Sequence, residues 1–297
     1  MSGELWPSQY PFAGRRLDLG GHRMHYLDEG KGETVLMVHG NPSWSFYFRE
    51  LVKSMRETNR CIAPDHIGMG LSDRPGEDRY RYTLKSRIDD LDALVKRIAP
   101  SGPVTLVLHD WGGMIGMGWA VRHPERVKSI VAFNTACFRL QSEKNFPGLL
   151  SVMRGSLTGV PIRASRLARR FVLSTCTARR KLSPEAVDAY LSVCDGWDES
   201  LAVHRFVQDI PLAPGDPAWE TVVDIESKLG SFKDTPMLLP WGMKDWVFDG
   251  SFLKGWTSRF PKAAVRPFPE CGHFLLEDAP EELVPLVRDF ISRPVPA

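Results

Sequence analysis

The chain has 297 residues, of which 43% are apolar and 25% are charged, and this balance is typical of a globular protein. Its formal net charge of +2 offers no support for nucleic-acid binding. No run of about 18 apolar residues predicts a membrane-spanning helix, and residues 1–12 lack the pattern of a secretory signal. Five scattered cysteines, without paired spacing, favour free thiols and a cytoplasmic location.

The first half of the chain alternates predicted strands with predicted helices. Buried apolar runs predict the strands, and apolar residues at helical spacing predict the helices. Strands that alternate with helices in this way predict a mainly parallel sheet covered on both faces. The strands are expected at residues 15–19, 23–28, 34–39, 61–63, 104–108 and 127–134, and the helices at 46–55, 83–98 and 114–121.

The rhythm of strand and helix breaks between residues 135 and 228. Only helix-like pieces occur there, and the strand pattern resumes at residues 237–242 and 264–266 before a last helix at 281–291. We therefore expect a core domain of residues 1–134 and 229–297, with a helical cap of residues 135–228 over the carboxyl edge of the sheet. The cap helices are expected at 149–157, 164–173 and 184–194.

A carboxylate occupies a sharp turn between the predicted strand 104–108 and the helix that follows it. Asp110 stands there, before Trp111 and two glycines. A strand, a glycine-rich turn and a helix form a nucleophile elbow, which lifts one side chain above the end of a sheet. A carboxylate in that place predicts attack on carbon and a covalent ester intermediate.

Three other predicted strands end in polar residues: Asn41, Asp245 and His273. Each has a structural alternative when taken alone, because Asp245 could be a solvated loop acid and His273 a hydrogen-bonded structural histidine. Asp110 could likewise be a helix cap. Ligands of open α/β sheets bind beyond the carboxyl ends of the strands, and the order nucleophile, acid, histidine is that of the α/β-hydrolases. The order therefore predicts a catalytic triad of Asp110, Asp245 and His273.

Four motifs resemble the haloalkane dehalogenase and epoxide hydrolase branch of the α/β-hydrolases. The resemblance covers nearly the whole chain and is weakest in the predicted cap. It implies the α/β-hydrolase fold, with a mostly parallel central sheet flanked by helices and an inserted helical cap. The motifs lie at residues 40–42, 65–72, 109–113 and 272–280.

The residue types favour a halide leaving group over an epoxide. Epoxide hydrolases use two cap tyrosines as acids, whereas Tyr190 alone falls in this cap, and they usually carry glycine where Leu108 stands. A halide needs only donors that take up its charge. The Trp111 indole and the Asn41 amide are such donors, and the pair resembles the halide clamp of some dehalogenases. As alternatives, Trp111 could be a core residue and Asn41 a turn former.

The position of the acid narrows the resemblance. Some dehalogenases carry a glutamate after the strand that follows the elbow helix, but residues 134–137 contain none, which leaves Asp245. Asn41 together with Asp245 resembles the third dehalogenase subfamily. That subfamily includes the β-lactone decarboxylases of bacterial olefin biosynthesis, which residues 41–49 and 206–212 also resemble. We therefore expect a haloalkane dehalogenase-type hydrolase, with a β-lactone decarboxylase as the alternative. The substrate is expected to be a small apolar haloalkane or β-lactone.

The expected mechanism needs neither a metal nor a cofactor, and the eight histidines show no ligand spacing. Asp110 would displace a halide ion and form an alkyl ester, and His273, oriented by Asp245, would activate the water that hydrolyses it. The backbone N–H groups of Asn41 and Trp111 would form the oxyanion hole. A non-catalytic receptor on this fold is the alternative from another class, and it would be expected to have a broken triad.

The predicted cap contains a basic stretch. Seven cations lie between Arg163 and Lys181 with no acid among them. Such a run is typical of a solvated helix face. The alternative is a contact surface for an acidic partner, such as a pathway enzyme or a membrane surface, or for a second copy of the chain.

Overall fold

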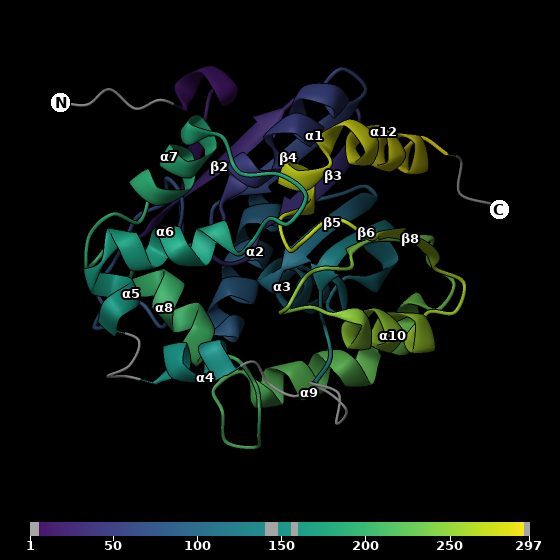
Figure 1. The fold of residues 1–297 in the computed structure, drawn as a ribbon. Coiled ribbons are helices and arrows are strands. Elements are labelled where there is room, and N and C mark those ends of the chain that lie inside the picture. Colours follow the sequence, from purple (N-terminus) through teal and green to yellow (C-terminus); the bar gives the residue numbers. More distant parts are fainter. Residues whose placement is uncertain (1–5, 140–147, 156–159, 294–297) are drawn as a thin grey trace.

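The computed structural model describes residues 6–139, 148–155 and 160–293 (Figure 1). Its described residues form an eight-stranded sheet in the order β1-β2-β4-β3-β5-β6-β7-β8. β2 is antiparallel to β1 and β4, and the strands from β4 to β8 along this order are parallel. The predicted α/β architecture is therefore confirmed. The strands are β1 (Arg15–Asp18), β2 (Arg23–Glu29), β3 (Glu33–Val38), β4 (Asn59–Pro64), β5 (Val104–Asp110), β6 (Val127–Thr135), β7 (Met237–Gly242) and β8 (Ala264–Phe268).

Helices cover both faces of the sheet. Alternate residues of the central strands enter two separate apolar clusters: Leu36 and Val38 of β3 face one cluster, and Val35 and Met37 face the other. Strands buried on both faces are continuously apolar, which is why they could be predicted. The first cluster includes residues of α2 (Leu84–Ile98), α3 (Trp111–Ala120), α9 (Trp219–Lys228) and α10 (Gly250–Arg259). The second includes residues of α1 (Arg49–Met55), α11 (Leu275–Asp278) and α12 (Pro280–Ile291).

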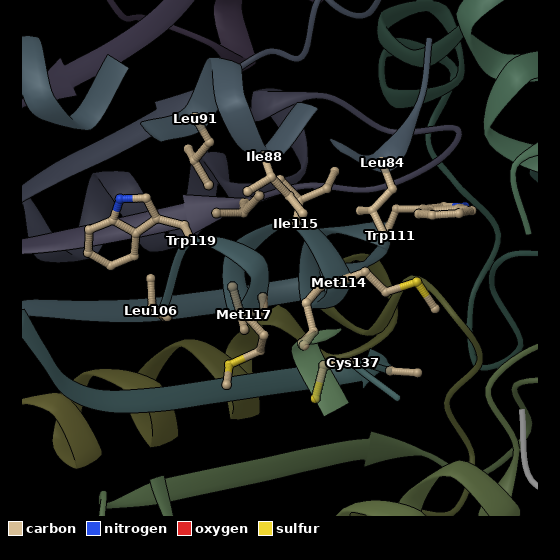
Figure 2. Packing of buried hydrophobic residues seen from close by; sticks show 14 of the residues in the cluster. Leu84, Ile88, Leu91, Leu106, Trp111, Met114, Ile115, Met117, Trp119 and Cys137 are labelled. Atoms are coloured by element: carbon tan, nitrogen blue, oxygen red, sulfur yellow. The ribbon is translucent and has the colours of Figure 1, made fainter. Parts of the chain in front are cut away.

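The contact between α2 and α3 holds the elbow helix against the sheet. Figure 2 shows Ile88 of α2 lying close above α3, on the side opposite Met117. A Cβ atom at Gly118 would collide with the Ile88 side chain, so the two helices approach closely only because residue 118 is glycine. The predicted helix 83–98 is present, with Thr83 as its N-cap.

Five helices between β6 and β7 lie together on one side of the molecule (Figure 1). They are α4 (Gly148–Arg154), α5 (Val160–Ala164), α6 (Arg166–Ser174), α7 (Pro184–Ser192) and α8 (Leu201–Gln208). The predicted helices 164–173 and 184–194 overlap α6 and α7, and the end of the predicted helix 149–157 lies outside the described residues. α8 was not predicted, although Ala202, Val203, Phe206 and Val207 form an apolar face; the helix has only eight residues, which is a short run on which to recognise helical spacing. α9 contacts α3, the elbow helix of the core.

Across the described ranges, we find no helix whose length and apolar character would let it cross a membrane.

A buried carboxylate joins the loops around the carboxyl end of β4. Asp65 accepts hydrogen bonds from the backbone N–H groups of Ser45 (2.7 Å) and Leu71 (2.9 Å), and it bonds His25 Nδ1 (2.8 Å). Burial alone would raise its pKa, but the charge and hydrogen bond of His25, together with the backbone donors, lower it to about 2. Asp65 therefore links three segments and fixes their relative positions: the segment after the Asn41 turn, the loop 65–72 and β2.

Replacing Asp65 by Asn is expected to lower the free energy of unfolding by about 1–3 kcal/mol at pH 7, because buried donors lose their acceptor. The pKa of Asp65 in the folded state lies below its ordinary value of 3.8. Its contribution to stability is therefore complete above pH 4 and is lost as the pH falls toward 2. Urea denaturation of both proteins at pH 7 and pH 3 should show a difference that shrinks at the lower pH. The matched control is Asp224→Asn, whose exposed ion pair with Lys228 contributes little.

Candidate active site

The elbow predicted at the end of β5 is present, and glycines make it possible. Asp110 ends β5 with φ 51° and ψ −127°, a backbone conformation that residues other than glycine rarely adopt. A Cβ atom at Gly112 would collide with the Val38 carbonyl, and one at Gly113 would collide with the Thr135 side chain. Only glycine lets the turn fit between β3 and β6, and the turn presents the Asp110 side chain beyond the edge of the sheet.

The two oxygens of the Asp110 carboxylate have different surroundings. Oδ1 accepts a hydrogen bond of 2.6 Å from the backbone N–H of Asn41, and the backbone N–H of Trp111 also bonds the carboxylate. Oδ2 lies 3.5 Å from Nε2 of His273. One oxygen is thus held by the backbone and the other faces the histidine, as an attacking atom would.

The structure brings His273 and Asp245 to the same place from two other strand ends. His273 Nδ1 lies 2.8 Å from Oδ2 of Asp245, and Asp245 Oδ1 accepts hydrogen bonds from the N–H groups of Val247 (2.7 Å) and Phe248 (3.1 Å). The Phe248 ring stacks on the imidazole. His273 is therefore held on one edge by a fixed carboxylate while its other edge faces Asp110, which is the geometry of a catalytic triad.

Burial and charge act against each other in this cluster. Burial raises the pKa of Asp110 above its ordinary value, and the charge of His273 and the two backbone donors only partly offset it. Burial lowers the pKa of His273, but the charge and hydrogen bond of Asp245, with the charge of Asp110, outweigh it and raise the pKa. The backbone donors and the N-terminus of α3 favour the Asp110 anion, and burial opposes it. A protonated His273 compensates for it.

Asn41 and Trp111 lie beside the carboxylate. The Asn41 side-chain amide donates to the Val203 carbonyl of α8 (3.2 Å), while its Oδ1 is buried and has no partner among the described residues. The Trp111 ring packs against Phe206 of α8 and lines the same cavity as Asp110. Asn41 thus has one amide hydrogen bonded to the cap and a second that can serve a ligand.

A cavity of about 120 Å³ opens in front of these groups. Asp110, His273, Asn41 and Trp111 are its polar lining, and the rest is almost wholly apolar. Apolar walls around a few convergent polar groups are typical of a site for an apolar ligand. The walls include Met114 of α3, Leu150 and Met153 of α4, Val172 of α6, Val207 and Ile210 near α8, and Phe138, Trp246, Phe248 and Phe252.

The tyrosine of the predicted cap takes no part in this cavity. The hydroxyl of Tyr190 donates to Glu277 (2.6 Å), which also forms a buried ion pair with Arg49. Tyr190 does not line the cavity that contains Asp110. Its hydroxyl is therefore not placed to protonate an epoxide oxygen. This position agrees with the prediction from the sequence that epoxides are disfavoured as substrates.

Two residues at the site were missed by sequence reasoning. The Asn134 amide bonds the backbone N–H (2.8 Å) and carbonyl (2.9 Å) of Gly242, at the end of β7 before Asp245. The available signal was an asparagine that ends a buried strand. Cys176 lines the cavity, and burial, with the charges of Asp245 and Asp110, raises its thiol pKa far above the ordinary value. No sequence spacing indicated that position.

No group of three or more His, Cys, Asp or Glu side chains in the described part of the chain is arranged to hold a metal ion.

Comparison with known proteins places this geometry in a family. Residues 33–280 match the family model described as the alpha/beta hydrolase fold. The solved structure of the haloalkane dehalogenase DatA from Agrobacterium tumefaciens superposes with a TM-score of 0.82 at 24% identity, over 95% of this chain and 96% of that one. This likeness concerns the fold.

Curated relatives match over nearly their full length. Cis-3-alkyl-4-alkyloxetan-2-one decarboxylases from Shewanella oneidensis and Xanthomonas campestris are 45% and 43% identical, over 95% and 96% of this chain and 89% and 97% of theirs. Haloalkane dehalogenase 2 of Mycobacterium tuberculosis is 30% identical, over 93% of this chain and 94% of its own. The chain is therefore an enzyme of the α/β-hydrolase fold family, in the group that contains these decarboxylases and the haloalkane dehalogenases.

Proposed function

We propose that the protein decarboxylates β-lactones that carry alkyl groups on the two saturated ring carbons, C3 and C4, releasing carbon dioxide and a cis-alkene. The observation that carries this proposal is the 45% identity to a cis-3-alkyl-4-alkyloxetan-2-one decarboxylase over 95% of the chain, against 30% for the dehalogenase. The arrangement of Asp110, His273 and Asp245 supports covalent catalysis on either substrate. The higher similarity therefore places the decarboxylase first of the two activities that the motifs indicate.

The first step uses Asp110 as the nucleophile. Its Oδ2 attacks C4, the saturated ring carbon bonded to the ring oxygen. The bond between C4 and that oxygen breaks. The electron pair of this bond goes to the oxygen, which becomes part of a free carboxylate, and the ring strain is released. The second amide hydrogen of Asn41 and the Trp111 indole can bind the new carboxylate. Oδ1 of Asp110 stays on the backbone N–H of Asn41 throughout.

The second step releases both products and regenerates Asp110. The substrate carboxylate leaves as carbon dioxide, and the electron pair that joined it to the neighbouring ring carbon, C3, forms the double bond between C3 and C4. The ester bond to Oδ2 breaks, and its electron pair returns to Asp110. No water is consumed. His273, 3.5 Å from Oδ2 and protonated beside Asp245, stabilises the returning charge.

A haloalkane dehalogenase is the second candidate, favoured by the two donors, Asn41 and Trp111, next to the nucleophile. Asp110 would displace the halide and form an alkyl ester. His273 would then take a proton from water, which attacks the ester carbonyl while the backbone N–H groups of Asn41 and Trp111 bind the oxyanion. General-base help of this kind contributes about 10²–10⁴-fold to the rate.

We also propose the division of the chain into a core of residues 1–134 and 229–297 and a cap of 135–228. The ring of Trp111 against α8 and the bond from Asn41 to Val203 support a cap that covers the site. α9, at the end of this range, contacts α3 of the core, so we propose that the cap ends before Trp219 instead of at residue 228. Five buried free thiols support a cytoplasmic location.

A partner surface on the basic stretch stays a proposal of lesser weight. Arg166 and Arg169 contact Asp195, Arg179 pairs with Glu282, and Arg180 pairs with Glu281. These acids come from outside the stretch, so the local positive charge is smaller than the sequence alone indicates. This pairing supports a structural role for much of the stretch. Docking of a pathway enzyme or of a second copy of the chain would use the charge that remains.

The origin of the oxygen atoms in Asp110 separates the two candidate reactions. Turnover of a dialkyl β-lactone in ¹⁸O-water is expected to give alkene and carbon dioxide and to leave Asp110 unlabelled, because no water attacks the ester. Hydrolysis of a haloalkane ester would place a water oxygen in Asp110. Mass spectrometry of the peptide that contains Asp110 measures the label. A labelled Asp110 after lactone turnover, or no alkene at all, would contradict the decarboxylase proposal.

Replacing His273 by Ala is expected to stop ester hydrolysis and to trap an adduct on Asp110 with a bromoalkane, seen as an increase in protein mass. This outcome would show that Asp110 can attack a carbon–halogen bond. If no haloalkane gives an adduct while the wild-type protein forms alkene from a lactone, the dehalogenase candidate fails.

Replacing Asp245 by Asn removes the charge that raises the pKa of His273, so this pKa is expected to fall. With a lactone, the reaction needs the protonated imidazole, and the high-pH limb of the kcat profile should move to lower pH. With a haloalkane, the reaction needs the neutral imidazole, so the low-pH limb should move to lower pH and kcat should fall by about 10²–10⁴-fold. The control is Glu270→Gln, an exposed acid paired with Lys244. Unmoved limbs in the Asp245 variant would contradict its role.

A further inference from the structure

A second, smaller cavity adjoins the one that contains Asp110. Its volume is about 30 Å³, against about 120 Å³ for the larger cavity. Four residues line both cavities: Asn41, Pro42, Met153 and Val172. Because the walls are shared, the smaller cavity begins where the larger one meets the Asn41 turn, and it extends between α6, α7 and α8.

Most of the remaining wall of the smaller cavity is apolar. Leu173, Leu191 and Val203 are buried aliphatic side chains. The hydroxyl of Tyr190 is bonded to Glu277, and the Arg169 guanidinium donates to the carbonyls of Arg163 (2.8 Å) and Asp195 (2.6 Å). The surface offered to a ligand is therefore largely hydrocarbon, which suits an alkyl group.

The junction of the two cavities lies next to the nucleophile. Asn41 belongs to both linings, and its backbone N–H holds Oδ1 of Asp110. A ring whose carbon is attacked by Asp110 would sit at this junction. The two alkyl groups of such a ring leave from two adjacent carbons, and two cavities lead away from the junction.

We propose that the two cavities bind the two alkyl groups of a β-lactone separately, one group in the larger cavity and the other in the smaller. This inference rests on the proposed decarboxylase function and deepens it. The unequal volumes make the smaller cavity the part of the site that limits chain length at one ring carbon. Leu191 of α7 and Ile210 after α8 each line one cavity and not the other, so they set the two limits independently.

Two isomeric lactones test this division. One carries octyl at C3 and methyl at C4, and the other has the two groups exchanged. Leu191→Phe fills the smaller cavity and is expected to shift the ratio of kcat/KM between the isomers about tenfold toward the isomer whose octyl group lies in the larger cavity. Leu191→Ala enlarges the smaller cavity and should shift the ratio the other way. Ile210→Phe narrows the larger cavity, so it should shift the kcat/KM ratio in the direction opposite to the shift caused by Leu191→Phe.

The ratio is measured on one enzyme sample, so a partly misfolded variant does not distort it. Leu167→Phe is the matched control, because Leu167 of α6 is 79% exposed and lines neither cavity. A ratio that moves in the same direction in Leu191→Phe and Ile210→Phe, or that stays constant in all variants, would overturn the division into two arms. Absence of alkene from the wild-type protein with both isomers would instead refute the proposed function.

Discussion

The hydrogen bond from the Asn41 backbone N–H to the Asp110 carboxylate joins the two strand ends on which the site is built. β3 and β5 are neighbours in the sheet, so the turn after β3 reaches the elbow after β5. The bond orients the carboxylate, leaving one oxygen toward His273. It also places the Asn41 side chain against the cap at Val203, where both cavities meet. The Asp110 carboxylate, the Asn41 side chain and α8 are thus positioned through one residue, Asn41.

Electrostatics in the site depend on the exclusion of water. Asp110, His273 and Asp245 are all buried, so each charge is costly alone and stable only beside its opposite. Burial raises the pKa of Asp110, which disfavours its anion, whereas the charges of Asp245 and Asp110 raise the pKa of His273 and favour its cation. The carboxylate of Asp245 favours the state in which His273, and not Asp110, holds the proton. The remaining cavity walls are apolar, so this pair is the main source of charge that a substrate meets.

Much of the fold and the triad could be predicted from the sequence because their signals are local. β3 and β5 are buried on both faces and therefore continuously apolar, and the elbow needs glycines beside Asp110. The positions of Asp245 and His273 follow from strand order. The role of Asn134 could not be predicted, because it depends on a contact with Gly242, more than a hundred residues away. The smaller cavity is likewise a product of tertiary packing between α6, α7 and α8, which no periodicity in the chain records.

The buried thiol of Cys176 has a chemical consequence for an enzyme that accepts strained lactones. A β-lactone is an acylating agent, and a thiolate near it would be acylated at the ring carbonyl. Burial and the neighbouring carboxylates raise the pKa of Cys176 far above the ordinary value, so the thiolate is essentially absent at neutral pH. The negative charge that Asp245 supplies to His273 thus also suppresses a competing nucleophile in the same cavity. With the proposed lactone substrate, the site would thus direct the electrophile to Asp110 and spare Cys176.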